Sequence, residues 1–360
     1  MRKLNKLFLL GFISFSVLVS SCKKDEEPTP TAPKGKYENG VIISNEGVFG
    51  SGNGSISFYS NEKDTVFNDV YKTENKIPLG DVVQSTFRAK DKTLIVVNAS
   101  NKVVVVNTKD FKHLAEINIK QPRYVAVKDN KAYVSSWANN GYVYIVNLDT
   151  YLVVDSVKTG VGPEGVLINN NTLYVANSGG WGKDSTITVV NLSNNSTKSI
   201  NIHADCPSSI KIDKNNKIWV LAKGSIMYDA NWTVIGHAPS KLIQIDIDDN
   251  SITKTIKLFD NAHPSKLGIN KNKDKLYYGG SFGFYGLYEI GIDEILAPTE
   301  PLIKEQNYGF IIDDVNNKIF LLQEAYTSNG KLIRYKADGT RIKEYSVGIY
   351  PSSGNVSKKK

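Results

Sequence analysis

The sequence is poor in the residues that build disulfide-stapled or metal-centred domains. It holds two Cys and four His in 360 residues, and no His pair has the HxH or HExxH spacing of a metal site. Two Cys exclude a disulfide scaffold and a Cys-rich zinc module, and the scattered His argue against a His-built catalytic metal. The phosphate-binding glycine motifs GxGxxG before a helix and GxxxxGK[ST] are absent. We therefore expect neither a metal nor a cofactor.

What is present favours an all-β fold. Apolar residues make up 41% of the chain and aromatics 10%, with 19 Tyr, which is enough for a large core. Branched and aromatic side chains suit a pleated surface, and no segment keeps an apolar period of 3.6 residues; residues 293–297 allow one helical turn. The formal charge of +8 comes from evenly spread Lys and Arg, so nucleic acid is not an expected partner.

Residues 1–21 have the pattern of a signal peptide. Arg2, Lys3 and Lys6 precede the apolar run Leu7–Val19, which as a helix would be about 20 Å long and shorter than the roughly 30 Å hydrocarbon core. This favours a secretory signal over a membrane span. The run ends in small residues before Cys22 and resembles the bacterial lipobox, in which the Cys becomes lipidated. An ordinary signal peptidase site beside a chance Cys is the alternative.

Residues 22–36 are expected to form a tether behind the lipid. The segment 23–27, Lys-Lys-Asp-Glu-Glu, resembles the export signal that sends lipoproteins of Bacteroidota to the outer face of the outer membrane; a merely solvated tether is the alternative. Residues 28–33 are a Pro-rich spacer, stiff and extended. We therefore expect a lipid-anchored protein of the outer membrane that faces the cell exterior and meets the membrane through its lipid only.

A repeat of about 44 residues organises residues 37–357. Its clearest copies start at Pro122, Pro163, Pro207 and Pro264, each with an alternating strand, a polar turn and a second strand of the Leu-Tyr-Val-Ala-Asn type. Two weaker strands complete each unit, such as 142–146 with 153–157. Four short strands in a unit of 40–45 residues predict a propeller blade.

Counting the repeats predicts how the ring closes. Six units start between residues 84 and 307, and a seventh start at 350–356 has a first strand with nothing after it. The segment 40–71 lacks a first strand, since 41–44 has the pattern of a second. We therefore expect a seven-bladed β-propeller in which the C-terminal strand pairs with the N-terminal blade and leaves no open edge. A six-bladed ring with a stray tail is the alternative.

Two segments resemble a known family. Residues 144–177, with Tyr-Ile-Val-Asn-Leu-Asp-Thr and Leu-Tyr-Val-Ala-Asn, resemble the YVTN repeat of YncE-like propellers. Residues 44–57, with Ser-Asn-Glu-Gly, resemble the opening of the surface-lipoprotein branch in Bacteroidota. The best-understood members of that branch bind cobalamin or related corrinoids and cover a TonB-dependent outer-membrane transporter. The resemblance therefore implies a corrinoid or another large small-molecule ligand, and a transporter partner.

In the geometry of this family, the binding face is made by loops before first strands and after second strands. Aromatics gather there, which is unusual for surface loops and suggests a large flat ligand or a protein partner. The insertion Gly224–Lys241 adds to the same face. The candidate ligand-binding residues are Glu46, Phe49, Asn98, Arg123, Tyr124, Trp137, Glu164, Asn177, Trp181, Tyr228, Trp232, Phe282, Phe284, Tyr285, Tyr308, Tyr326 and Tyr350.

Other functions compete with corrinoid capture. Aromatic rims suit glycans, peptides and protein partners equally well. Oxygen ligands at positions 46, 98, 164 and 177 resemble the calcium site of lactonase-type propellers, but Asn commonly forms turns and no Asp is placed to act as a base. We therefore expect a binding protein and no enzyme, with a lactonase-type hydrolase as the least favoured reading. Lys128 and Asn170 are expected on the opposite face.

Overall fold

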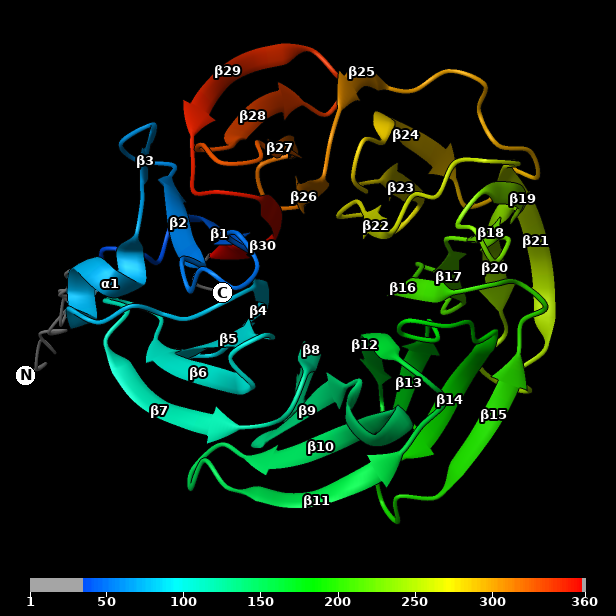
Figure 1. Ribbon diagram of the computed structural model, residues 1–360, viewed down its shortest axis with the longest axis horizontal. Coiled ribbons are helices and arrows are strands. Elements are labelled where there is room, and N and C mark those ends of the chain that lie inside the picture. The colour runs from blue at the N-terminus through cyan, green and yellow to red at the C-terminus, as the bar shows by residue number, and fades with distance from the viewer. Residues whose placement is uncertain (1–34, 358–360) are drawn as a thin grey trace, which may run out of the picture. The chain divides into compact units, whose positions relative to one another are not determined.

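The computed structural model describes residues 35–357, where seven four-stranded antiparallel sheets form a ring (Figure 1). The predicted seven-bladed β-propeller is confirmed. Blade 1 holds β1 (Gly40–Asn45), β2 (Ser55–Ser60), β3 (Thr65–Phe67) and β30 (Pro351–Ser357). Blade 2 holds β4 (Val83–Ala89), β5 (Lys92–Val97), β6 (Lys102–Asn107) and β7 (His113–Asn118), and blade 3 holds β8 (Pro122–Lys128), β9 (Lys131–Ser136), β10 (Tyr142–Asn147) and β11 (Val153–Lys158).

The remaining blades follow in chain order. Blade 4 holds β12 (Pro163–Asn169), β13 (Thr172–Asn177), β14 (Thr186–Asn191) and β15 (Thr197–Asn201). Blade 5 holds β16 (Pro207–Ile212), β17 (Ile218–Ala222), β20 (Ser240–Ile245) and β21 (Ile252–Phe259). Blade 6 holds β22 (Lys266–Ile269), β23 (Lys275–Gly279), β24 (Tyr285–Gly291) and β25 (Ile303–Gln306), and blade 7 holds β26 (Gly309–Asp313), β27 (Lys318–Gln323), β28 (Lys331–Lys336) and β29 (Arg341–Ser346).

The two ends of the chain share blade 1. β30 lies beside β1 as the innermost strand of that blade (Figure 1), and the pairing is antiparallel, from Gly40 opposite Ser357 to Asn45 opposite Pro351. The predicted closure by the C-terminal strand is therefore confirmed, and the six-bladed alternative is wrong. The pairing covers the inner edge of β1, which would otherwise be an open strand edge.

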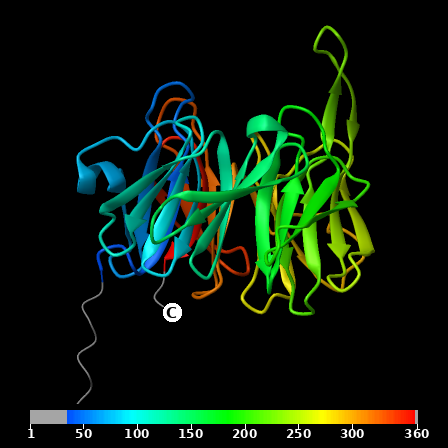
Figure 2. The same cartoon turned by 90° about the horizontal axis from the view of Figure 1, so that it is seen from below.

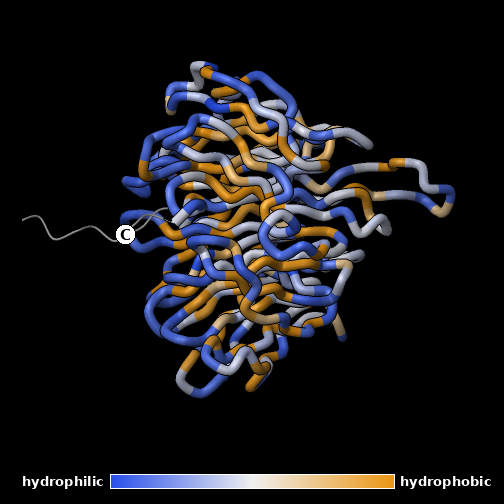
Figure 3. The backbone as a smooth tube through the Cα atoms, turned by 90° about the vertical axis from the view of Figure 1, so that its left-hand side faces the viewer, coloured by the Kyte–Doolittle hydropathy of each residue, from blue (hydrophilic) through white to orange (hydrophobic). Residues whose placement is uncertain are grey.

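The core of the described residues consists of apolar clusters between neighbouring blades. Side chains alternate along each strand, so the two faces of a blade pack against different neighbours. In β13, for example, Leu173 and Val175 pack toward blade 3, while Tyr174 and Ala176 pack toward blade 5. The tube in Figure 3 shows apolar segments along the blades and polar segments in many of the connecting loops. Each blade is therefore held from both sides, and none has a core of its own.

Helical structure lies where the sequence did not indicate it. The helical turn allowed at residues 293–297 is absent, and that segment is a loop with Ile295 and Leu296 exposed. A short helix, α1 (Val70–Asn75), instead packs Val70 and Tyr71 into the cluster between blades 1 and 2. A 3-10 turn, η1 (Ala138–Asn140), follows β9. No helix in the described part of the chain is long and apolar enough to cross a membrane.

Tyr37 fixes the point where the N-terminal segment joins the propeller. Its ring is 1% exposed and makes edge contacts with Phe58 and Phe111. Its backbone N–H donates to the carbonyl of Lys109, and its own carbonyl accepts from the Ser357 hydroxyl. Lys109 lies in the turn after β6, so the chain enters at the end of the ring opposite the Pro-containing starts of the inner strands. The predicted signal peptide and Cys22 lie outside the described residues.

The predicted insertion in blade 5 is a separate hairpin. β18 (Ser225–Tyr228) and β19 (Val234–Ala238) form a two-stranded sheet that joins no other sheet in the described part of the chain. Figure 2 shows this hairpin rising from one end of the ring, and Figure 3 shows apolar residues along it. Isolated hairpins are marginally stable in water, so the contacts at its base determine its position.

Candidate functional site

A cavity of about 960 Å³ opens at the end of the ring from which the hairpin rises. Loops of blades 1 to 7 and the hairpin contribute to its lining, so the cavity is shared by the whole ring. Most of the candidate residues line it: Glu46, Phe49, Asn98, Arg123, Tyr124, Trp137, Glu164, Trp181, Tyr228, Trp232, Phe282 and Tyr308. For these residues, loops before first strands and loops after second strands therefore share one surface, as the sequence analysis expected.

A repeated backbone hydrogen bond, called the joint below, connects the loop before an inner strand to the loop after the second strand of the same blade. The residue before the inner strand is left-handed, and its carbonyl accepts from the backbone N–H of the residue after the second strand. The joint recurs in five blades, with acceptor and donor Tyr350 and Glu46, Val82 and Asn98, Gln121 and Trp137, Gly162 and Ser178, and Cys206 and Lys223. Because the joint repeats, each blade delivers its loop residues to the same end of the ring.

Gly162 shows why one of these joints requires glycine. Its φ is +60°, and a Cβ at this position would lie 1.9 Å from the backbone nitrogen of Gly180. This close approach fixes the loop that carries Trp181, a residue that is 92% exposed. Val82 occupies the same position in blade 2 with φ +53°. A β-branched residue is strained in this region, and the hydrogen bond from the Asn98 backbone holds it there.

Arg123 and Glu164 form a desolvated ion pair on the cavity wall. Their side chains are 15% and 8% exposed, and the guanidinium nitrogen NH2 lies 2.8 Å from Glu164 Oε1. Arg123 also donates to Gln84 Oε1 at 2.5 Å and lies over the Trp137 ring, 4.2 Å from its centroid. Burial lowers the pKa of Arg123, but the charge and hydrogen bond of Glu164, together with Tyr124 and Glu46, outweigh this and raise it. The pair stays charged and holds the Trp137 ring in place.

Two further hydrogen bonds join different blades at the cavity. Lys266 Nζ of blade 6 donates to Tyr124 Oη of blade 3 at 3.1 Å. Blades 3 and 6 are opposite in a ring of seven, so this bond crosses the axis. Tyr308 Oη donates to Glu46 Oε2 at 3.0 Å, and burial together with the Glu46 charge raises the pKa of Tyr308 well above its ordinary value. Tyr308 therefore remains a hydrogen-bond donor at every physiological pH.

The aromatic side chains at the mouth are arranged in contacting pairs. The ring centroids of Trp137 and Trp181 are 5.6 Å apart, and those of Tyr228 and Trp232 are 5.9 Å apart. The ring of Phe282 contacts the ring of Tyr326, with centroids 5.6 Å apart. Such edge and tilted contacts fix ring orientation. The Trp137 Nε1 donor is buried and has no hydrogen-bond partner among the described residues.

Five candidate residues do not line the cavity. Asn177 is fully buried and donates to the hydroxyls of Thr186 and Thr188 within its own blade. Phe284 is 7% exposed and packs in the core between blades 5 and 6. The remaining three point outward or lie behind the lining rings: Tyr285, which donates to the Lys304 carbonyl, Tyr326, which contacts Phe282, and Tyr350, which contacts Tyr308.

The cavity also contains residues that the sequence reasoning missed. They are mainly polar and occupy the same two loop positions as the aromatics, so extending the rule to polar residues would have found most of them. His263, in the loop before β22, also lines the cavity. The missed lining residues with polar side chains are Gln84, Gln121, Lys183, Cys206, Ser208, Lys223, Ser225, Ser265, Lys266 and Ser281.

Of the four side chains considered for calcium, the two carboxylates have other partners, and the two amides are bonded through their nitrogens. Glu46 accepts from Tyr308, Glu164 pairs with Arg123, and the Asn98 amide donates to the Pro122 carbonyl. Asn177 is bonded within its own blade, as described above. Among residues 35–357, no three His, Cys, Asp or Glu side chains gather closely enough to hold a metal. The residues present therefore do not fit a lactonase-type calcium site.

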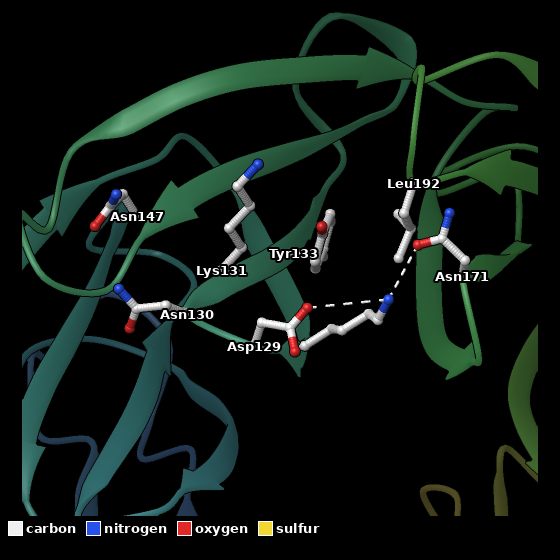
Figure 4. A pocket seen from close by; sticks show the side chains of 8 residues that line it. Asp129, Asn130, Lys131, Tyr133, Asn147, Asn171 and Leu192 are labelled. Atoms are coloured by element: carbon white, nitrogen blue, oxygen red, sulfur yellow. Dashed lines mark hydrogen bonds and ion pairs between the residues drawn. The ribbon is translucent and has the colours of Figure 1, made fainter.

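A smaller hollow of about 260 Å³ lies at the other end of the inner strands. It is lined by turn residues of blades 3 and 4, among them Lys128, Asp129 and Asn171 (Figure 4). Lys128 Nζ donates to Asn171 Oδ1 at 3.0 Å and lies 4.0 Å from Asp129 Oδ2, and the dashed lines in the figure mark these two contacts. This face carries no aromatic pairs like those of the cavity, so its residues serve as controls for binding.

Comparison with known proteins gives a family without an assigned activity. The model of a domain of unknown function, DUF5074, matches residues 39–352. The chain therefore belongs to the DUF5074 family. No curated protein matches the chain.

Solved structures agree in fold at low sequence identity. A periplasmic gluconolactonase from Pseudomonas aeruginosa has a TM-score of 0.65 and 9% identity, covering 88% of this chain and 98% of its own. A functionally unknown protein from Desulfotomaculum acetoxidans has a TM-score of 0.64 and 11% identity, covering 89% and 100%. A chain of Kuenenia stuttgartiensis hydrazine synthase has a TM-score of 0.56 and 14% identity, covering 73% and 85%. At these identities the similarity concerns the fold alone.

Proposed function

We propose that this DUF5074 protein captures a large, flat, polar-edged ligand of the corrinoid class, such as cobalamin, and performs no chemistry on it. The observation that carries the proposal is the cavity of about 960 Å³ with aromatic rings at its mouth and hydrogen-bonding side chains on its walls. A cavity of this volume lies at the upper end of the range that binds small-molecule ligands. A corrin ring offers flat faces to aromatic side chains, and its peripheral amides require both donors and acceptors.

The wall chemistry supports a neutral, amide-rich ligand. Glu46 and Glu164 are matched by Tyr308 and Arg123, so the carboxylates of the lining are already satisfied. Gln121 lines the cavity with a side-chain amide, which can donate and accept at once, whereas the Gln84 carbonyl is already used by Arg123. The exposed Trp181 ring adds a flat apolar face at the mouth. A ligand with carbonyl groups around a flat centre would use both features.

The direction of the cavity supports capture at a surface. The N-terminal segment joins the propeller at the end opposite the mouth, through Tyr37 and the Lys109 carbonyl. If Cys22 is lipidated, the mouth would face away from the anchoring membrane and toward arriving ligand. Delivery to a TonB-dependent outer-membrane transporter is part of the proposal, and the sequence resemblance of residues 44–57 is its support.

A glycan is the second candidate, because exposed Trp and Phe side chains also stack on sugar rings. Phe49, Trp181 and Trp232 are each at least 81% exposed, which suits a ligand that extends beyond the mouth. A hydrolase of the lactonase type is disfavoured, because both candidate carboxylates are paired and Asn177 does not line the cavity. The gluconolactonase named above shares the fold with this chain, and this similarity extends to no residue role.

Calorimetry with the purified full chain tests the proposal. Cobalamin, cobinamide and a glycan panel are titrated in turn, and we expect heat and competition from the two corrinoids. Truncating Trp137, Trp181 or Trp232 to Ala should weaken binding, and at least one should cost about 2 kcal/mol, which is a roughly thirtyfold rise in Kd. Folding should survive, because all three residues lie outside the strands.

Matched controls come from the opposite face. Lys128, the last residue of β8, and Asn170, in the turn after β12, lie at the other end of blades 3 and 4, so Lys128→Ala and Asn170→Ala should leave binding unchanged. No heat with either corrinoid at micromolar protein would refute the corrinoid proposal, and heat with a glycan would then favour the second candidate. Corrinoid binding that survives in all three Trp variants but fails in the controls would show that the ligand binds at the opposite face of the ring, where the control residues lie.

A further inference from the structure

The hairpin β18–β19 reaches the cavity with its aromatic residues but touches the ring only near its base. Tyr228 and Trp232 line the cavity from its outer half. At the base, the Gly224 N–H donates to the Asp205 carbonyl, and the Ser225 hydroxyl donates to Asp205 Oδ2 at 2.6 Å. These two bonds hold only the first residues of β18. The angle of the hairpin over the mouth therefore depends on what holds β19.

β19 is held by a pair of histidines. His237 lies opposite Ile226 in the hairpin, and its Nδ1 is 2.9 Å from Nε2 of His263, in the loop before β22. The two ring planes are 16° apart with centroids separated by 5.2 Å. Centroids this far apart with nitrogens this close mean that the rings meet nitrogen to nitrogen. A metal ion between them would need bonds of about 2.0 Å to each nitrogen, so the gap fits a shared proton and not a metal.

The protonation of this pair follows from its neighbours. His263 Nδ1 is 2.7 Å from the Lys223 carbonyl, which can only accept, so His263 Nδ1 carries the proton. Neutral His263 then has a lone pair on Nε2, and His237 must donate to it through Nδ1–H. One added proton is tolerated, because one of the two facing nitrogens can still accept. Two added protons leave N–H groups facing each other with no acceptor.

We infer that His237 and His263 are positioning residues that hold the aromatic face of the hairpin over the cavity and release it when both rings are protonated. The inference rests on the proposed function, because it describes how the same site retains its ligand. The pair acts through Tyr228 and Trp232, whose place over the mouth it fixes.

The charges around the pair determine the direction of its pH dependence. Burial lowers the pKa of His263, and the charges of His237 and Lys223 lower it further against the raising effect of the Lys223 carbonyl. Asp205 and Cys206 lie in the loop packed against the hairpin base, and Asp229 lies in the hairpin turn. The closed hairpin therefore favours neutral His263. This contribution is fully present above the ordinary His pKa of about 6.5 and is lost as the pH falls through the lowered pKa of His263.

Two substitutions separate positioning from general structure. His237→Ala removes the donor at every pH and should raise the Kd for cobalamin about fivefold at neutral pH, the effect of one lost hydrogen bond. His237→Asn keeps an N–H near the Nδ1 position and can turn its carbonyl to a protonated His263. It should bind like the natural protein at neutral pH and keep that affinity in acid, where the natural protein weakens. His203→Asn, at an exposed left-handed position, is the control and should change nothing.

Hydrogen exchange of residues 225–238, measured without ligand, gives a second readout. His237→Ala should exchange faster than the natural protein at neutral pH, and at acid pH the natural protein should exchange faster than His237→Asn under the same conditions. Equal exchange and affinity of His237→Ala and the natural protein would overturn the inference, as would the same acid loss in His237→Asn. If cobalamin binds none of these proteins, the proposed function fails, and the exchange data still decide the role of the pair.

Discussion

Ending the chain at Tyr350 would remove β30 and reopen the ring. β30 is the innermost strand of blade 1 and pairs with β1 from Gly40 to Asn45, over six facing residue pairs. In an antiparallel ladder every second pair exchanges two hydrogen bonds, so about six backbone bonds disappear. At a net value of about 1 kcal/mol each, the loss is about 6 kcal/mol. This is comparable with the whole stability of many domains, about 5–15 kcal/mol.

Side-chain contacts add to this loss. Ser353 and Asn355 bond to β4 of blade 2, through the Gln84 carbonyl and the Thr86 hydroxyl. On the other side, Val41 and Ile43 are fully buried in the cluster between blades 7 and 1, and without β30 they would lie beside an unpaired strand edge. With about 2 °C per kcal/mol for a large domain, Tm should fall by more than about 10 °C, and the open edge should promote aggregation.

Thermal unfolding followed by circular dichroism measures this effect. The matched control removes residues 358–360 only, which leaves β30 complete and should leave Tm unchanged. A chain ending at Tyr350 that melts within about 2 °C of the full chain would refute the reasoning, because the ring would then be held closed by contacts other than the β1–β30 ladder.

Two further changes test the anchor and the contact between blades 7 and 1. Cys22→Ala should release the protein from the membrane fraction and abolish its protease-accessible signal on intact cells; a variant that stays bound and accessible would contradict lipidation. Hydrogen bonds from Tyr345, Lys343 and Tyr59 hold the pKa of Asp64 well below its ordinary value, so this contact should weaken as the pH falls below about 5. Asp64→Asn should lower Tm at neutral pH and flatten its acid decline, and an unchanged acid decline would assign the loss to other carboxyl groups.

The fold could be predicted because its information is local and repeated. Each unit repeats the Pro position, the polar turn and the second strand, and the same backbone joint then forms in five blades. Closure followed from an incomplete unit at each end of the chain, which only pairing can complete. The short helix α1 had no such signal. It forms because Val70 and Tyr71 fill the space between blades 1 and 2, which is a tertiary cause.

The site was predictable to the level of loops but not of side-chain direction. Phe282 lines the cavity, while Phe284, two residues later, turns into the core against Phe259. Asn177 ends β13 and turns back to Thr188 within its blade. The side that Asn177 faces is set by the register of β13, and a shift of one position would reverse it. Phe282 and Phe284 lie in the turn before β24, where Gly283 with φ +69° separates them. A rule based on loop membership cannot resolve this difference.

Contacts that cross the ring are outside the reach of sequence spacing, and they constrain the proposed function most. Tyr124 and Lys266 are 142 positions apart and bond across the axis at the cavity, so a ligand that moves along the axis meets this bond. A captured molecule would therefore enter and leave through the one mouth that the hairpin borders. Any partner that takes over the ligand must then approach the same face. The residues that hold the hairpin would therefore influence both ligand capture and ligand transfer. Substitutions in the histidine pair test whether these two steps depend on the position of the hairpin.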